Sequence, residues 1–236
     1  MQFDTSTSSS WKFGHRGRVA VFIDGNNLFH AARFHTIDID YNKLLRILLG
    51  DGRLLRAFFY TGVDAGAERQ QGFLLWMRRN GFRVVQKELK TFYDGTRKAN
   101  LDVEIAVDML SLAGRYDTAV LVSGDEDFVY AVNAVAYKGC RVEVAGFRSN
   151  TAPRLIDVAD FFIDLGDIAE LIRKDSGQNE GYEIPSFVPP GELPMSDEPR
   201  GMSRENGRNS RNSQNPNEDG EPKNDVRPFV RVSDEQ

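Results

Sequence analysis

The chain has 236 residues, 40% of them hydrophobic, and a net charge of −5, which suits one well-filled domain with appendages. A single cysteine, Cys140, excludes an internal disulfide, and no apolar stretch approaches the roughly 20 residues of a membrane-spanning helix. The N-terminus lacks the basic start and apolar core of a signal peptide, so we expect a soluble, cytoplasmic protein without a membrane partner.

Strand and helix patterns alternate from Arg18 to about residue 174, which predicts one domain over residues 18–174. Short apolar runs predict strands at residues 19–23, 54–60, 82–86, 118–122 and 141–146, with a short sixth strand at 161–164. Helical spacing predicts helices near residues 39–49, 65–80, 100–113, 126–138 and 166–173, and a turn of helix after Asn27. This alternation is typical of an α/β fold, in which helices cover both faces of a parallel sheet.

The two ends of the chain have a different composition. Residues 1–17 are rich in Ser and Thr, and we expect them to be disordered. Residues 176–236 hold eight of the nine prolines, and their 7 Lys and Arg against 12 Asp and Glu account for the whole net charge. Such a segment buries too little apolar surface to offset its ordering entropy, so we expect residues 175–236 to form a disordered, acidic tail. Two apolar islands in it, at 184–190 and 227–232, could dock a protein partner, although most islands of this kind have no role.

Four aspartates are predicted to lie at one edge of the sheet. Asp24 ends the first strand, and Asp125 and Asp127 follow the fourth. Asp102 lies in the first turn of the helix that leads into the fourth strand. Because helix N-termini and strand carboxyl ends meet at the same edge of a parallel sheet, topology alone brings all four there. Whether they converge depends on the order of the strands.

Converging carboxylates would require a cation or protonation. Two of them about 5 Å apart repel by roughly 3 kcal/mol at an effective dielectric of about 20. Hard oxygen ligands without a nearby His or Cys favour Mg²⁺ or Mn²⁺ over zinc. The three histidines show no ligand spacing, and no nucleophile is paired with a base. This pattern indicates metal-assisted hydrolysis of a phosphodiester.

Each aspartate also has a plainer interpretation. Asp24 could bond the turn amides that follow its strand, and Asp102 could complement a helix dipole. Asp125 could cap a helix, with Asp127 in its favourable first turn. Asp108, six residues after Asp102, is rotated from it by roughly 240° around the helix, which favours a structural anchor.

Polar and basic residues accompany the acidic set. Asn26 and Asn27 could orient Asp24 or bond a substrate phosphate, and Ser123 could do so from the other loop. Lys98 could meet a phosphate or be an ordinary solvated lysine. Residues 66–98 carry eight basic and three acidic side chains, which suits the approach of a polyanion as well as it suits a solvated helix face.

Three blocks of the sequence resemble the signature motifs of the NYN domain, in its LabA-like bacterial subgroup. They are Phe-Ile-Asp-Gly-Asn-Asn at 22–27, Lys-Ala-Asn-Leu-Asp at 98–102 with Ala-Val-Asp-Met at 106–109, and Leu-Val-Ser-Gly-Asp-Glu-Asp-Phe at 121–128. The resemblance covers about residues 18–168. It implies a PIN-like fold, a three-layer α/β/α sandwich with a central parallel sheet whose first and fourth strands are neighbours.

The resemblance also implies a ribonuclease that uses Mg²⁺ or Mn²⁺. Asp24, Asp102, Asp125 and Asp127 fall on metal-binding positions of the family, and Asp108 falls on a further family position. We therefore expect hydrolysis of RNA, single-stranded or structured, with Asn26, Asn27, Ser123 and Lys98 near the substrate. A homodimer is also open.

Other functions remain open to different degrees. A regulator that binds RNA or protein without cleaving it would keep the same site as a scaffold. A phosphatase of the haloacid dehalogenase type needs Asp-x-Asp after the first strand, where this chain has Asp24-Gly-Asn26. A dinucleotide-binding protein is disfavoured because no Gly-x-Gly-x-x-Gly follows that strand.

Overall fold

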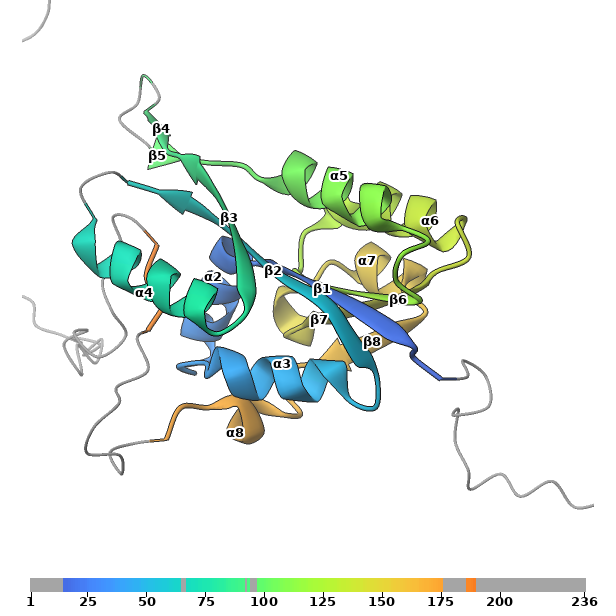
Figure 1. Cartoon of the computed structure of the whole chain (residues 1–236). Coiled ribbons are helices and arrows are strands. Elements are labelled where there is room, and N and C mark those ends of the chain that lie inside the picture. The colour runs from blue at the N-terminus through green and yellow to red at the C-terminus, as the bar shows by residue number, and fades with distance from the viewer. Residues whose placement is uncertain (1–14, 65–66, 92, 94–96, 176–185, 190–236) are drawn as a thin grey trace, which may run out of the picture. The chain divides into compact units, whose positions relative to one another are not determined.

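A six-stranded parallel sheet forms the centre of the protein (Figure 1). The computed structural model describes residues 15–64, 67–91, 93, 97–175 and 186–189. Every pair of neighbouring strands in this sheet is parallel. In sheet order the strands are β3 (Phe82–Glu88), β2 (Arg53–Val63), β1 (Arg18–Asp24), β6 (Thr118–Val122), β7 (Arg141–Gly146) and β8 (Phe161–Asp164).

Helices cover both faces of the sheet, which makes a three-layer α/β/α sandwich (Figure 1). One face packs against α2 (Gly25–Phe34), α3 (Tyr41–Leu49), α4 (Glu68–Arg79) and α8 (Ala169–Ile172). The other face packs against α5 (Asp102–Leu112), α6 (Val129–Ala136) and α7 (Pro153–Val158). The fold class expected from the sequence, a three-layer α/β/α sandwich with a central parallel sheet, is confirmed.

Strand β1 shows why an apolar run becomes a central strand. Its side chains alternate between the two helical layers: Val19, Val21 and Ile23 join one core cluster, and Ala20 and Phe22 join the other. All five are fully buried, so a run without polar alternation is what this position requires. The strand is hydrogen-bonded on both sides, to β2 and to β6.

All six predicted strands are present, with ends within three residues of the predicted ones. The predicted turn after Asn27 is instead a ten-residue helix, α2, which begins directly at Gly25. The Gly-Asn-Asn start has weak helix propensity, but Asp24 caps the helix by accepting a hydrogen bond from the Asn27 amide. The predicted helix at 126–138 is divided into a 3₁₀ turn, η1 (Glu126–Phe128), and α6.

Four short elements were not predicted. They are a two-stranded antiparallel ladder of β4 (Lys90–Thr91) and β5 (Arg97–Lys98), a 3₁₀ turn η2 (Arg148–Asn150), and α7. Each is too short for a hydrophobic period to be recognised. The helix α7 does begin with Pro153 at its first position, which is a recognised start signal.

Part of the segment expected to be a disordered tail is packed against the domain. Ser186 to Pro189 are described, and Phe187 is only 4% exposed within the core cluster of α2, α3 and α4. Residues 176–185 and 190–236 lie outside the described residues, as do residues 1–14 at the other end. The expectation of disorder therefore does not hold for these four residues.

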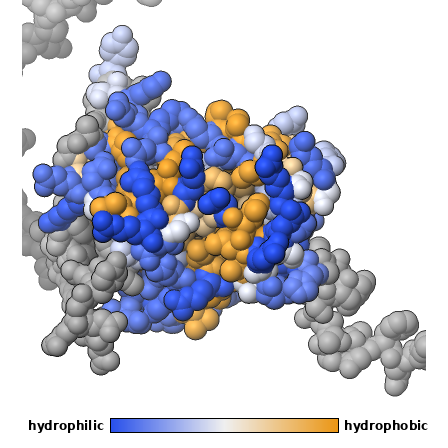
Figure 2. All heavy atoms as spheres, viewed as in Figure 1, coloured by the Kyte–Doolittle hydropathy of each residue, from blue (hydrophilic) through white to orange (hydrophobic). Residues whose placement is uncertain are grey.

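One apolar area of the surface lies between α3 and α5 on the face shown in Figure 2. The first part of β2 extends beyond β3, which pairs only with residues 57–63. On that extension Leu54 and Leu55 are each more than one third exposed.

In the described part of the chain, no helix is long and apolar enough to span a membrane. The expected homodimer stays a prediction.

Candidate active site

The carboxyl ends of β1 and β6 bring two predicted site residues together. In the parallel ladder Ile23 is paired with Val122, so the next residues, Asp24 and Ser123, are neighbours. The Ser123 hydroxyl donates a hydrogen bond to Asp24 Oδ2 at 3.2 Å. The adjacency of the first and fourth predicted strands, which convergence of the acids requires, is therefore present.

Asp24 is a largely buried carboxyl group. Burial raises its pKa to about 6 from an ordinary value of 3.8, and the nearby negative charges of Asp102 and Asp125 add to the shift. Hydrogen bonds from the Asn27 amide and from Ser123 act in the opposite direction and lower the pKa. A buried acid whose charge is penalised and only partly compensated is typical of a functional site.

The loop after β6 presents two further aspartates. Asp125 is the N-cap of η1, and its Oδ1 accepts a hydrogen bond from the Asp127 amide at 3.0 Å. Its own amide donates to Ser123 Oγ at 3.3 Å. Asp125 is half-buried, whereas Asp127 is exposed. The capping role expected as the plainer interpretation of Asp125 is therefore present.

Asp102 is held at the start of α5 by a residue that sequence reasoning missed. Asn100 Oδ1 accepts a hydrogen bond from the Asp102 amide at 2.8 Å, and Asn100 Nδ2 donates to Asp102 Oδ2 at 2.6 Å. Lys87, at the end of β3, donates to the Asn100 carbonyl and to Glu104. Burial raises the pKa of Asp102, and the negative charges of Asp125 and Asp127 contribute to this shift.

Three of the four predicted metal ligands form a compact group. One carboxylate oxygen from each of Asp102, Asp125 and Asp127 lies within 4.8 Å of the others. Asp24 is outside this group, but it lies close enough for the charges of Asp102 and Asp125 to raise its pKa. The donor set consists only of carboxylate oxygens, which is the hard-ligand set that Mg²⁺ and Mn²⁺ prefer.

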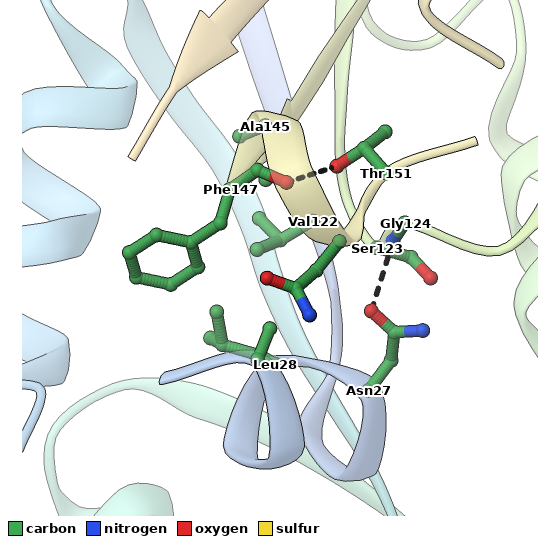
Figure 3. A pocket seen from close by; sticks show the side chains of 11 residues that line it. Asn27, Leu28, Val122, Ser123, Gly124, Ala145, Phe147 and Thr151 are labelled. Atoms are coloured by element: carbon green, nitrogen blue, oxygen red, sulfur yellow. Dashed lines mark hydrogen bonds between the residues drawn. The ribbon is translucent and has the colours of Figure 1, made fainter. Parts of the chain in front are cut away.

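Asn27 joins the two acidic loops to each other. Its amide donates to Asp24, and its side-chain Oδ1 accepts a hydrogen bond from the Gly124 amide at 2.9 Å (Figure 3). This places Asn27 in a positioning role within the site rather than at its open surface. It lines a pocket of about 10 Å³, room for about one water molecule, together with Leu28, Ala31, Val122, Ser123, Gly124, Ala145, Gly146, Phe147, Asn150 and Thr151.

The turn η2 closes over the loop that carries Asp125. The amide of Ala152 donates to the Gly124 carbonyl at 2.9 Å. A Cβ atom on Gly124 would lie 2.1 Å from the backbone oxygen of Asn150, so only glycine allows this approach. His35 contacts the same turn: its Nε2 lies within hydrogen-bond distance, 2.9 Å, of Ser149 Oγ and of Asn150 Oδ1.

We expect Gly124→Ala to lower the free energy of unfolding by about 2–4 kcal/mol, because the clash is with backbone that cannot move aside. Urea unfolding followed by circular dichroism measures this loss. Gly72→Ala is the matched control, since Gly72 lies exposed within α4 and its Cβ would meet nothing within 4 Å. That change should raise stability by about 0.5–1 kcal/mol. Equal effects of the two substitutions would contradict the close approach.

Asp108 and Asn26 do not belong to the three-carboxylate group. Asp108 lies later in α5, where its Oδ2 accepts a hydrogen bond from the Tyr60 hydroxyl at 2.9 Å. Asn26 Oδ1 accepts a hydrogen bond from Thr61 at 3.3 Å. These hydrogen bonds connect α5 and α2 to β2, so Asp108 and Asn26 hold these elements together beside the three-carboxylate group.

The basic segment 66–98 is not one surface beside the acids. Arg78 and Arg79 lie in the last turn of α4, next to the start of β3 and far along the strand from its carboxyl end. Lys87 and Lys90 lie at the carboxyl end, and Lys87 is paired with Glu104. The side chain of Lys98 lies outside the described residues. The middle of the segment, at the end of α4 and the start of β3, therefore lies at the opposite edge of the sheet from the acidic site, whereas Arg69 in the first turn of α4 lies at the same edge as the acids.

Comparison with known proteins agrees with the fold and the motifs. A sequence profile of the NYN domain matches residues 18–167. The low amplitude and bright protein LabA of Synechococcus elongatus is 34% identical over 180 residues, which are 73% of this chain and 96% of LabA. An uncharacterized protein of Methanocaldococcus jannaschii is 25% identical over 160 residues, 66% of this chain and 59% of that protein.

A solved structure shows the same architecture. The crystal structure of a protein of unknown function from Vibrio parahaemolyticus superimposes with a TM-score of 0.60 at 27% identity, and the match covers 68% of this chain and 98% of that one. The matched range of the NYN profile includes all three acidic motifs, at residues 22–27, 98–109 and 121–128. The chain belongs to the NYN domain family and is similar to LabA.

Proposed function

We propose that the protein is a metal-dependent ribonuclease that hydrolyses RNA phosphodiester bonds at Asp24, Asp102, Asp125 and Asp127, with Mg²⁺ or Mn²⁺ as cofactor. The observation that carries the proposal is the convergence of Asp102, Asp125 and Asp127 within 4.8 Å. Membership of the NYN family, which belongs with the PIN-like nucleases, supports hydrolysis as the reaction.

The carboxylates of the site repel one another, and a divalent cation bound between them would neutralise this repulsion. Three carboxylates within 4.8 Å repel one another, and burial penalises the charge of Asp24 beside them. Neutralisation by a cation would remove both penalties. When bound, Mg²⁺ or Mn²⁺ supplies an activated water and neutralises charge on the scissile phosphate.

The surrounding residues would act on the substrate and on the acids. Ser123 and Asn27 fix the orientation of Asp24 and of the Gly124 loop through their hydrogen bonds. The predicted contacts to the substrate stay Asn26, Asn27, Ser123 and Lys98. Lys90 is a further exposed cation at the same edge.

End-labelled single-stranded RNA and DNA of matched sequence, incubated with Mn²⁺, Mg²⁺ or EDTA, test the proposal. We expect cleavage of RNA that requires the metal and stops in EDTA, because the carboxylates cannot hold a phosphate without a cation. Preferential cleavage of DNA would reject RNA as the substrate class. Metal binding by folded protein without cleavage would favour the alternative, a silent NYN-domain regulator.

A further inference from the structure

The segment Ser186–Pro189 fills an aromatic groove on the domain. Phe187 is 4% exposed, and its ring centroid lies 5.8 Å from that of Phe29, 5.0 Å from Phe59 and 5.2 Å from Phe73. These three rings come from α2, β2 and α4. The groove therefore takes one aromatic side chain from a segment far along the sequence, and each ring contact adds to the burial of apolar area.

Polar contacts fix the start of the same segment. Ser186 Oγ donates a hydrogen bond to Asp38 Oδ2 at 2.8 Å and accepts one from Lys174 Nζ at 2.8 Å. Pro189, at the other end, is buried. A buried aromatic side chain next to defined polar contacts is typical of a peptide segment that is bound specifically.

The ring of Phe59 connects Phe187 to the residue beside Asp24. The ring of Phe59 lies against Gly25, where an added Cβ would be 2.5 Å from the ring carbon Cζ. Gly25 is the first residue of α2, which Asp24 caps, and Phe29 belongs to the same helix. Phe187 thus contacts both the ring that supports Gly25 and the helix that begins beside Asp24.

We propose that the groove between α2, β2 and α4 is a docking site for Ser186–Pro189 of this chain, and that docked Phe187 is a positioning residue for Asp24. Loss of the anchor would let Phe59 and α2 relax into the space and shift the Asp24 carboxylate. The positioning role rests on the proposed metal site, whereas the docking itself does not.

Thermal unfolding of the full chain tests the docking. Phe187→Ala should lower the melting temperature by about 10 °C, because it removes a fully packed aromatic ring. Phe34→Ala is the matched control: it makes the same change at a ring that is 72% exposed and should shift the melting temperature by less than about 2 °C. Equal effects of the two substitutions, or none from Phe187→Ala, would overturn the docking.

Titration with Mn²⁺ at a temperature where every variant is folded tests the positioning. Phe187→Ala should raise the Kd for Mn²⁺ about 10-fold, and Phe187→Leu, which keeps much of the volume and serves if the alanine variant does not fold, should restore most of the affinity. Leu48→Ala is the control for lost stability, since Leu48 is fully buried in the same cluster but lies at the opposite end of the strands.

Equal weakening by Leu48→Ala would mean that Phe187 acts only through stability, and it would overturn the positioning. Wild-type protein that binds no Mn²⁺ would reject the proposed metal site and the positioning with it. The melting temperatures would still decide the docking in that case.

Discussion

Replacing Asp125 and Asp127 together by Asn should abolish metal-dependent cleavage of RNA and weaken Mn²⁺ binding by more than about 100-fold. The two changes remove two of the three converging charges at nearly constant volume. They should leave the fold intact, because Asn caps a helix as well as Asp does and can still accept the hydrogen bond from the amide of residue 127. Gel assays of cleavage and calorimetric titration of Mn²⁺ measure the two losses.

Glu126→Gln supplies the matched control for this pair. Glu126 lies between the two aspartates in the sequence, but it is exposed and pairs with Arg154 rather than joining the carboxylate group. It should therefore retain cleavage within a few-fold of wild type. Cleavage that survives in the double variant would identify a contaminating nuclease or a different site, and a loss in Glu126→Gln as large as in the double variant would mean that general charge, not ligation, matters.

The strands of the sheet could be predicted from the sequence because each central strand is a short, continuous apolar run. Each central strand is a continuous apolar run, as β1 illustrates, and such a run has few alternatives in a chain where helices alternate with strands. The aspartates at strand ends and helix starts follow from that topology. Convergence needed the order of the strands, which depends on contacts between β1 and β6, 99 residues apart at Asp24 and Ser123.

The residues that sequence reasoning missed act through contacts that have no periodic signal. Asn100 gains its role from two hydrogen bonds to Asp102, two residues along the chain. Gly124 is required by the approach of Asn150 from another loop. Phe187 lies in the apolar island at 184–190, which the sequence marks as a possible docking segment, but composition alone indicates disorder and does not show that the island packs against the domain of its own chain.

The pKa of Asp24 has a consequence for stability that can be measured without a metal. Its pKa is about 6 in the folded protein and 3.8 as the ordinary value. Since the folded-state value is the higher one, protonated Asp24 favours the folded state below about pH 3.8, and this contribution is lost as the pH rises through about 6. At neutral pH the ionised carboxyl group therefore costs stability, by an upper estimate of about 3 kcal/mol.

Asp24→Asn should accordingly raise the free energy of unfolding of the metal-free protein by about 1–3 kcal/mol near pH 7.5, and the gain should vanish near pH 4. The Asn side chain cannot ionise and can still accept the hydrogen bond from the Asn27 amide. Urea unfolding in EDTA at several pH values measures the difference. A gain that does not depend on pH would show that burial of charge is not its cause.

Asp40→Asn makes the same chemical change at a buried aspartate that caps α3, away from the carboxylate group, and it should not increase stability. Added Mn²⁺ should then reverse the order of the Asp24 variants. Binding to the folded state stabilises the wild type by mass action, whereas Asp24→Asn has lost a charge that favours the cation. If ionised Asp24 destabilises the metal-free protein and stabilises the Mn²⁺-bound protein, then the role of Asp24 is metal binding and not stabilisation of the fold.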